Sequence, residues 1–212
     1  KSMAKKLNIT MKLGKEVTAQ EVLALKPYSI LVATGSNVIS IPLEGLDQVQ
    51  TVQAHDVLVN DMQFANKKVV VIGGGITGLE TALYINRQGT NQVSVVDMLP
   101  EWPVDMLDMR YQNEALLEVR HCNDQGVTLY YNNKVVKFAD GKLFIESTKD
   151  GEAKALPADV IVLSVGVKPN DALWQELLAS GHPSVWKAGD AIATGKINKA
   201  VLHGSKFGYS LN

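Results

Sequence analysis

The sequence contains one cysteine, Cys122, in 212 residues. A single cysteine cannot form an internal disulfide, a cysteine-rich metal site or a CxxC redox pair. The four histidines share no metal-ligand spacing, so we expect no metal. No apolar run reaches the ~18 residues that a membrane span needs, and we find no signal peptide. These absences predict a location in the reducing cytoplasm.

Charge of neither sign predominates. The 21 basic and 22 acidic residues give a net charge of −1, which provides no electrostatic reason to bind nucleic acid or an anionic membrane. A hydrophobic fraction of 46% in a chain of this length is enough to bury a core. We therefore expect one large domain or two small ones, and we find no internal repeat.

Short apolar runs alternate with helical patterns along the chain. Strand-like runs occur at 29–32, 67–72, 93–96 and 160–165, and apolar residues have helical spacing at 76–89, 111–120, 172–178 and 198–209. Strands of this kind, separated by helices, predict an α/β fold with a parallel sheet covered by helices. Asp140-Gly141, between two further short strand-like runs, predicts a β-hairpin.

The sharpest motif follows the strand-like run at 67–72. Gly73, Gly75 and Gly78 have the spacing GxGxxG between a strand and a helix. In a dinucleotide-binding turn, the first glycine permits the tight turn and the second lets a pyrophosphate approach the backbone. The third lets the helix pack against the strand, and the helix N-terminus offers N–H groups to the phosphates. The alternative is a glycine turn that only connects a strand to a helix.

Asp97 ends the next strand, 22 residues after Gly75. A carboxylate at this place can accept hydrogen bonds from an adenosine ribose and would repel a 2′-phosphate. The sequence has no Lys or Arg from Asp97 through Met109. We therefore expect NAD, with NADH preferred over NADPH. The alternative for Asp97 is a solvated carboxylate at a strand end.

Several segments together resemble a known family. Residues 68–82 (KVVVIGGGITGLETA) and 96–101 (VDMLPE) resemble the NAD-binding domain of the pyridine-nucleotide-disulphide oxidoreductase superfamily. Residues 30–35 (ILVATG) resemble its "ATG" motif, 165–170 (VGVKPN) its returning strand, and 187–190 (KAGD) its "GD" motif. The similarity is greatest to the C-terminal part of NADH:flavin oxidoreductases of the 2,4-dienoyl-CoA reductase type.

The resemblance implies two sets of cofactor-binding residues. On the NAD side it adds Gly166 and Glu80 near the nicotinamide, although Gly166 could be a simple turn and Glu80 an acid favoured by the helix dipole. The FAD side is implied by resemblance alone. It comprises Ala33, Thr34, Gly35, Gly189, Asp190 and a last helix that begins near Ile197.

The implied fold is a Rossmann-like NAD-binding domain at 65–156, with a β-hairpin crossover, inserted in an FAD-binding α/β domain formed by 1–64 and 157–212. The family's FAD domain opens with its own GxGxxG, and nothing in residues 1–27 resembles it. Because the chain also starts at Lys1, we expect a piece of a longer protein whose FAD site is incomplete. We expect self-association through the apolar surface that the missing N-terminal domain would cover.

The resemblance implies a flavin-dependent oxidoreductase that passes hydride from NADH to FAD and then to a centre outside the chain. Hydride transfer between stacked rings requires no side chain as acid or base, so we expect no catalytic residue. A non-catalytic NAD-binding sensor is the alternative, and it would have no reason to keep both the ATG and GD motifs. An NAD-linked dehydrogenase without flavin is a third reading, but the sequence offers no paired His and Asp for it.

Overall fold

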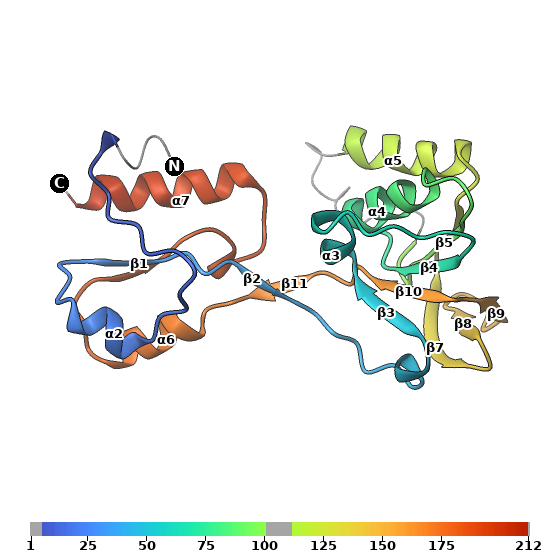
Figure 1. The fold of residues 1–212 in the computed structure, drawn as a ribbon, viewed down its shortest axis with the longest axis horizontal. Coiled ribbons are helices and arrows are strands. Elements are labelled where there is room, and N and C mark those ends of the chain that lie inside the picture. The colour runs from blue at the N-terminus through green and yellow to red at the C-terminus, as the bar shows by residue number, and fades with distance from the viewer. Residues whose placement is uncertain (1–5, 101–111, 212) are drawn as a thin grey trace. The chain divides into compact units, whose positions relative to one another are not determined.

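The computed structural model describes residues 6–100 and 112–211 of the chain, and Figure 1 shows its ribbon. The chain divides into two compact units. We call Val38–Gly166 the central unit, and Lys1–Asn37 together with Val167–Asn212 the terminal unit. Both units combine helices with parallel strands, which confirms the predicted α/β class.

The central unit is built on a five-stranded sheet in which every pairing is parallel. The strand order is β3 (Gln50–Gln53), β10 (Val160–Leu163), β4 (Lys68–Ile72), β5 (Gln92–Val96) and β6 (Thr128–Tyr130). All four residues of β10 are buried, as are the last four of β4. Strands covered on both faces must be apolar throughout, which explains why these two runs form the middle of the sheet.

The two faces of this sheet carry separate cores. Val69 and Val71 of β4 share one core with Leu79 and Leu83, because alternate residues of a strand point to opposite faces. Leu79 and Leu83 belong to a layer of helices on that face (Figure 1). These helices are α3 (Ala54–Val59), α4 (Ile76–Asn86) and α5 (Gln112–Asp124).

An antiparallel sheet covers the opposite face. Val70 and Ile72 of β4 share its core with Leu143. This sheet consists of β7 (Asn133–Ala139), β8 (Lys142–Ser147) and β9 (Ala153–Pro157). Asp140 and Gly141 join β7 to β8 with φ values of 52° and 70°. Positive φ at both positions is typical of a type I′ turn, so the predicted hairpin is confirmed.

The strand β10 lies elsewhere than the expected division of the chain would put it. We expected the residues after 156 to belong with the N-terminal stretch. In the structure, Ile161 pairs with Thr51 of β3 on one side and with Val70 of β4 on the other. The compact units divide at 37/38 and 166/167, and the assignment of 65–156 to an NAD-binding domain and of 1–64 and 157–212 to an FAD-binding domain stays a prediction.

The terminal unit contains a pair of parallel strands, β1 (Ile30–Val32) and β12 (Val185–Lys187). Ile30 and Val32 form a small core with Leu177. Thr18 and Glu21 form a capping box that starts α2, in which each side chain accepts a hydrogen bond from the other residue's N–H. The helices are α2 (Ala19–Ala24), α6 (Ala172–Ala179) and α7 (Ile197–Ser210). A second pair is formed by β11 (Val167–Pro169) and β2 (Ser36–Val38), which runs across the boundary between the units. The short 3₁₀ helix η3 (Gly189–Ala191) belongs to the terminal unit, and η1 (Leu46–Gln48) belongs to the central unit.

The two units share a strand arrangement that the sequence alone does not reveal. In the terminal unit, β1 pairs with β12 so that Ile30 lies opposite Val185. In the central unit, β10 pairs with β3 so that Ile161 lies opposite Thr51. When the sequences are aligned on these pairs, 29–35 corresponds to 160–166 and 185–190 corresponds to 51–56.

A third pair of segments shares one backbone feature, although residues 9–17 contain no strand. Residues 9–17 (ITMKLGKEV) match 127–135 (VTLYYNNKV), and φ is positive at the same step, at Gly14 (70°) and Asn132 (58°). In the central unit, the second segment contains β6, which pairs with β5. The terminal unit follows the plan of the central unit, but its described residues contain no counterparts of β4, α4 and β5.

Candidate functional site

The glycine-rich turn joins β4 to α4 in the central unit, as its spacing predicts. Gly73 leaves the strand with φ 107°, a conformation that favours glycine. A Cβ atom on Gly73 would lie 2.2 Å from the Ser164 carbonyl oxygen, and one on Gly78 would lie 2.0 Å from the Gly73 carbonyl oxygen. Neither position has room for a side chain. Gly75 is the N-cap of α4 and has no side chain that would cover the first turn of the helix, so an anion can approach the backbone there.

Asp97 lies at the end of β5, directly beside this turn. Its Oδ2 accepts a hydrogen bond from the Gly74 N–H at 2.6 Å, and its Oδ1 accepts one from the Leu99 N–H at 2.8 Å. A Cβ atom on Gly74 would lie 3.2 Å from the Cβ of Asp97 and 3.2 Å from Cε1 of Tyr131. The half-buried carboxylate is therefore held at the C-terminal edge of the sheet, where open α/β sheets bind their ligands.

Two further NAD-side candidates belong to the same unit. Gly166 has φ 89° and follows the exit of β10, where the Ser164 N–H donates to the Ile72 carbonyl at 2.8 Å. Because the Ser164 carbonyl also lies against Gly73, β10 leaves the sheet alongside the glycine turn. Glu80 lies on α4 and is exposed. The roles of Gly166 and Glu80 toward a nicotinamide stay predictions.

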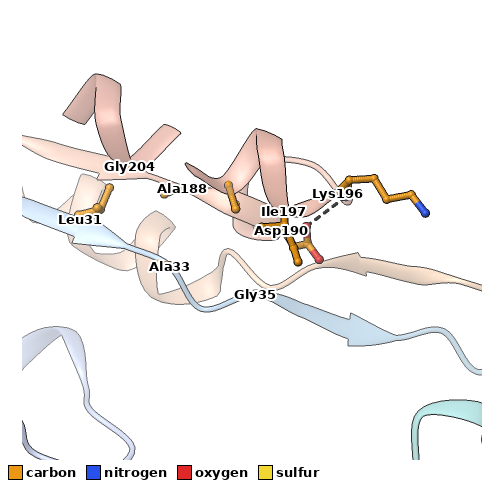
Figure 2. A pocket seen from close by; sticks show the side chains of 11 residues that line it. Leu31, Ala33, Gly35, Ala188, Asp190, Lys196, Ile197 and Gly204 are labelled. Carbon is orange, nitrogen blue, oxygen red and sulfur yellow. Dashed lines mark hydrogen bonds between the residues drawn. The ribbon is translucent and has the colours of Figure 1, made fainter. Parts of the chain in front are cut away.

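A cavity of about 470 Å³ opens within the terminal unit (Figure 2). It lies beside the C-terminal ends of β1 and β12 and the N-terminal part of α7. Its volume falls within the roughly 300–1,000 Å³ that small-molecule sites occupy. Five of the predicted FAD-side residues line it: Ala33, Gly35, Gly189, Asp190 and Ile197.

Thr34, the sixth predicted residue, does not line the cavity, and several residues that were not predicted do. The hydroxyl of Thr34 donates to the Asn170 carbonyl, and Thr34 is not among the lining residues. Two further lining residues, Leu31 and Ala188, lie within the quoted motif segments but were not predicted as site residues, and the motifs do not include Gly195, Lys196, Ala200 and Gly204. Ile197, Ala200 and Gly204 occur at helical spacing on α7, which is a signal that could have identified them.

Hydrogen bonds from two sides hold the carboxylate of Asp190 at the cavity wall. Oδ1 accepts from the Gly195 N–H at 3.1 Å, and Oδ2 accepts from the Ser36 hydroxyl at 3.5 Å. The preceding residue, Gly189, has φ 60° and its N–H donates to Nδ1 of His203 at 3.2 Å. The turn thus presents an oriented anion and a backbone bend to any ligand in the cavity.

The remaining reactive side chain, Cys122, is fully buried in the helix-side core of the central unit. Burial raises the pKa of its thiol to about 12, with a smaller contribution from the Glu118 charge. The thiol is therefore protonated near neutral pH and unreactive. Across residues 6–100 and 112–211, no group of three or more His, Cys, Asp or Glu side chains could hold a metal ion. In the same ranges, no helix has the length and apolar character needed to cross a membrane.

The fold and the glycine turn define a dinucleotide-binding α/β protein. Residues 2–204 match the model of the pyridine nucleotide-disulphide oxidoreductase family, and the chain belongs to this family. The resemblance seen in the sequence is confirmed. At the level of the family, a nicotinamide dinucleotide and a flavin are confirmed as cofactors.

Relatives of the chain include several reductases and an oxidase. It is 32% identical over 171 residues to bilirubin reductase of Mediterraneibacter gnavus, covering 78% of this chain and 25% of that protein. It is 29% identical over 211 residues to NADH oxidase of Thermoanaerobacter brockii, covering 96% and 31%. A solved structure of 2-naphthoyl-CoA reductase with 2-naphthoyl-CoA matches with a TM-score of 0.82 and 26% identity, covering 98% and 30%. The chain thus spans about a quarter to a third of each of these proteins.

Proposed function

We propose that this chain carries the NADH site and part of the FAD site of a flavin-dependent oxidoreductase. In the parent protein, hydride passes from NADH to FAD, and the electrons then leave for a centre outside this chain. The observation that carries the proposal is the presence in one chain of the glycine turn beside Asp97 and the cavity walled by Asp190. The names NADH oxidase and bilirubin reductase, borne by two relatives, support the same reaction class.

The central unit fits a nicotinamide dinucleotide. Gly73 and Gly78 let β4, α4 and the chain after β10 pack closely around the turn, because a Cβ atom at either position would meet a backbone carbonyl. Gly75, the N-cap of α4, leaves the first turn of the helix open to a pyrophosphate. Each oxygen of Asp97 accepts one backbone hydrogen bond and keeps a further lone pair for a ribose hydroxyl. The same negative charge opposes a 2′-phosphate. We therefore propose that NADH binds in preference to NADPH.

The terminal unit fits only part of FAD. The cavity and the Asp190 carboxylate suit a flavin with its polyhydroxyl side chain, whose hydroxyls can donate to a carboxylate. The described residues of this unit contain no GxGxxG turn between a strand and an α-helix that could receive a pyrophosphate. The shared strand arrangement indicates where such a turn belongs: beside β1, on the side away from β12, as β4 lies beside β10.

We propose that a strand–helix–strand segment of the parent protein pairs with β1 and completes the FAD site. Exposed apolar side chains on α7 support a covering partner, since Ile197, Val201 and Leu202 are 83%, 61% and 51% exposed. Where that segment is absent, we expect the exposed apolar side chains of α7 to drive self-association of the chain. A cytoplasmic location stays a prediction from the sequence.

The residues of this chain bind and orient, and we assign none of them a catalytic role. When bound, the two cofactors supply the hydride donor and the hydride acceptor. Asp97 and the glycine turn hold one end of the dinucleotide in place, and Asp190 with the N-terminal part of α7 orients the flavin. Positioning of this kind lowers the entropic part of the barrier without a proton transfer.

Isothermal titration calorimetry of the whole chain with NADH and NADPH tests the proposal. We expect NADH to bind at least about tenfold more tightly, because removing a charge-assisted hydrogen bond costs about 1.5 kcal/mol or more. Equal or tighter binding of NADPH would refute the assignment of Asp97. Flavin bound to the same chain would favour the oxidoreductase, whereas a chain that binds NADH but no flavin fits either a truncated oxidoreductase or a non-catalytic NAD-binding sensor.

A further inference from the structure

We infer that His203 is a positioning residue for the flavin side of the molecule, because its Nδ1 fixes the backbone of the Gly189–Asp190 turn at the cavity wall. The inference rests on the proposed function for the identity of the ligand. The hydrogen bond itself does not depend on that proposal. His203 is half-buried on α7 and belongs to none of the motifs in the sequence.

The turn begins where the ladder between β1 and β12 ends. The Ala188 N–H still donates to the Val32 carbonyl at 2.9 Å, in line with the strand pairing. At Gly189 the backbone bends with φ 60°, and the next N–H points instead to α7, where it donates to His203 Nδ1 at 3.2 Å. One side-chain acceptor therefore sets the orientation of the peptide between residues 188 and 189.

The other hydrogen bonds of the turn cannot replace this one. Asp190 is held through its own carboxylate by the Gly195 N–H and the Ser36 hydroxyl, and the Ile192 N–H donates to the Gly189 carbonyl at 3.0 Å. None of them fixes the Gly189 N–H. Glycine adopts positive and negative φ with similar ease, so its own backbone does not enforce the bend.

The packing of α7 shows why position 203 is suited to this role. A Cβ atom on Gly189 would lie 3.5 Å from the Cβ of Ala200, one turn before His203 on the same helix face. Gly204, the residue after His203, lines the cavity while His203 itself does not. His203 thus acts through the turn rather than on the ligand. Because only a ring nitrogen without hydrogen accepts, the bond requires a neutral imidazole with its proton on Nε2.

Two isosteric substitutions separate the hydrogen bond from the shape of the side chain. In His203→Asn, the amide oxygen can occupy the position of Nδ1 and accept the Gly189 N–H. In His203→Leu, a side chain of the same branching offers no acceptor. His182→Leu is a matched control, since Nδ1 of His182 accepts the Ser184 N–H at 3.2 Å in the same unit but away from the cavity.

The first readout is amide hydrogen exchange of the whole chain, measured by NMR. We expect the Gly189 amide to exchange at least about tenfold faster in His203→Leu than in the unmodified chain, and to return to within about threefold in His203→Asn. His182→Leu should leave Gly189 exchange unchanged. Equal protection of Gly189 in His203→Leu and His203→Asn would overturn the inference.

The second readout is an NMR titration with flavin mononucleotide, which carries the ring and the polyhydroxyl chain. We expect at least about fivefold weaker binding to His203→Leu, and unchanged affinity in His203→Asn and His182→Leu. If the unmodified chain binds the flavin and His203→Leu binds it equally well, the positioning role is wrong. If the unmodified chain binds none, the proposed flavin site fails, and the exchange experiment still decides whether His203 fixes the turn.

Discussion

The central and terminal units each contain a pair of parallel strands, but they differ in how far a sheet extends beyond that pair. The β1–β12 pair and the β10–β3 pair are both parallel. The central sheet then continues through β4, β5 and β6 and is covered on both faces. In the described part of the terminal unit, β1 has β12 as its one partner.

The two units therefore differ in how much apolar surface they bury and in whether a buried strand leads into a glycine turn. In the central unit, β4 is buried beside β10 and delivers Gly73 to the sheet edge. The terminal unit has a core centred on Ile30, Val32 and Leu177, and it leaves the apolar face of α7 exposed. The comparison teaches that two units with a pair of parallel strands can differ in whether a buried strand beside that pair brings a glycine turn to the edge of the sheet.

The largest expected effect comes from closing the glycine turn between β4 and α4 in the central unit. In Gly73→Ala, the new methyl group would meet the Ser164 carbonyl at 2.2 Å, so we expect a loss of about 3 kcal/mol or more in the free energy of unfolding. Gly89→Ala is the matched control. Its φ of 102° is similar but its surroundings are open, and it should cost only about 1–2 kcal/mol. Urea unfolding followed by circular dichroism measures both, and equal losses would contradict the packing argument.

The next effect tests the anion beside that turn. Asp97→Ala removes the ribose acceptor, so NADH affinity should fall about tenfold while NADPH affinity falls less, and the preference should narrow. Asp150→Ala, in the exposed turn between β8 and β9, should leave both affinities unchanged. Calorimetric titrations give the two dissociation constants, for NADH and for NADPH, of each protein. A preference for NADH that survives in Asp97→Ala would mean that another group selects the cofactor.

The parts of this structure that the sequence predicts are those with a local signal. The β4 strand, the glycine turn and Asp97 follow from spacing within 30 residues, and α4 and α7 follow from helical periodicity. The strand β3 was not predicted because its sequence QTVQ is half polar and short. It forms only because β10 offers a buried partner more than 100 residues later in the chain.

Sequence patterns predict the site around Asp190 in the terminal unit only in part. The Asp190 motif is recognisable, but the groups that hold it come from distant positions: Ser36 from β2 and His203 from α7. Neither residue type nor spacing marks them. The likeness of 9–17 to 127–135 is equally hidden, because the two segments share few identical residues and lead into different elements, a helix in one unit and the β7–β9 sheet in the other.

The smallest expected effect concerns the thiol in the central core. Burial raises the pKa of Cys122 from 9.0 to about 12. Between these values the unfolded chain loses a proton that the folded chain retains, so this stabilising contribution is complete below pH 9 and is lost as the pH rises. Cys122→Ala removes the effect. Between pH 7.5 and 10, the unmodified chain should lose about 1 kcal/mol more in urea unfolding than the variant does. Parallel losses would contradict the burial of the thiol.

The central claim is that one unit holds a complete NADH site and the other an incomplete FAD site. Calorimetric titration of the same preparation with NADH and with FAD tests it directly. We predict one NADH bound per chain, and FAD binding at least about a hundredfold weaker, because several charge-assisted hydrogen bonds to the pyrophosphate are missing. FAD bound at one per chain as tightly as NADH would contradict the account.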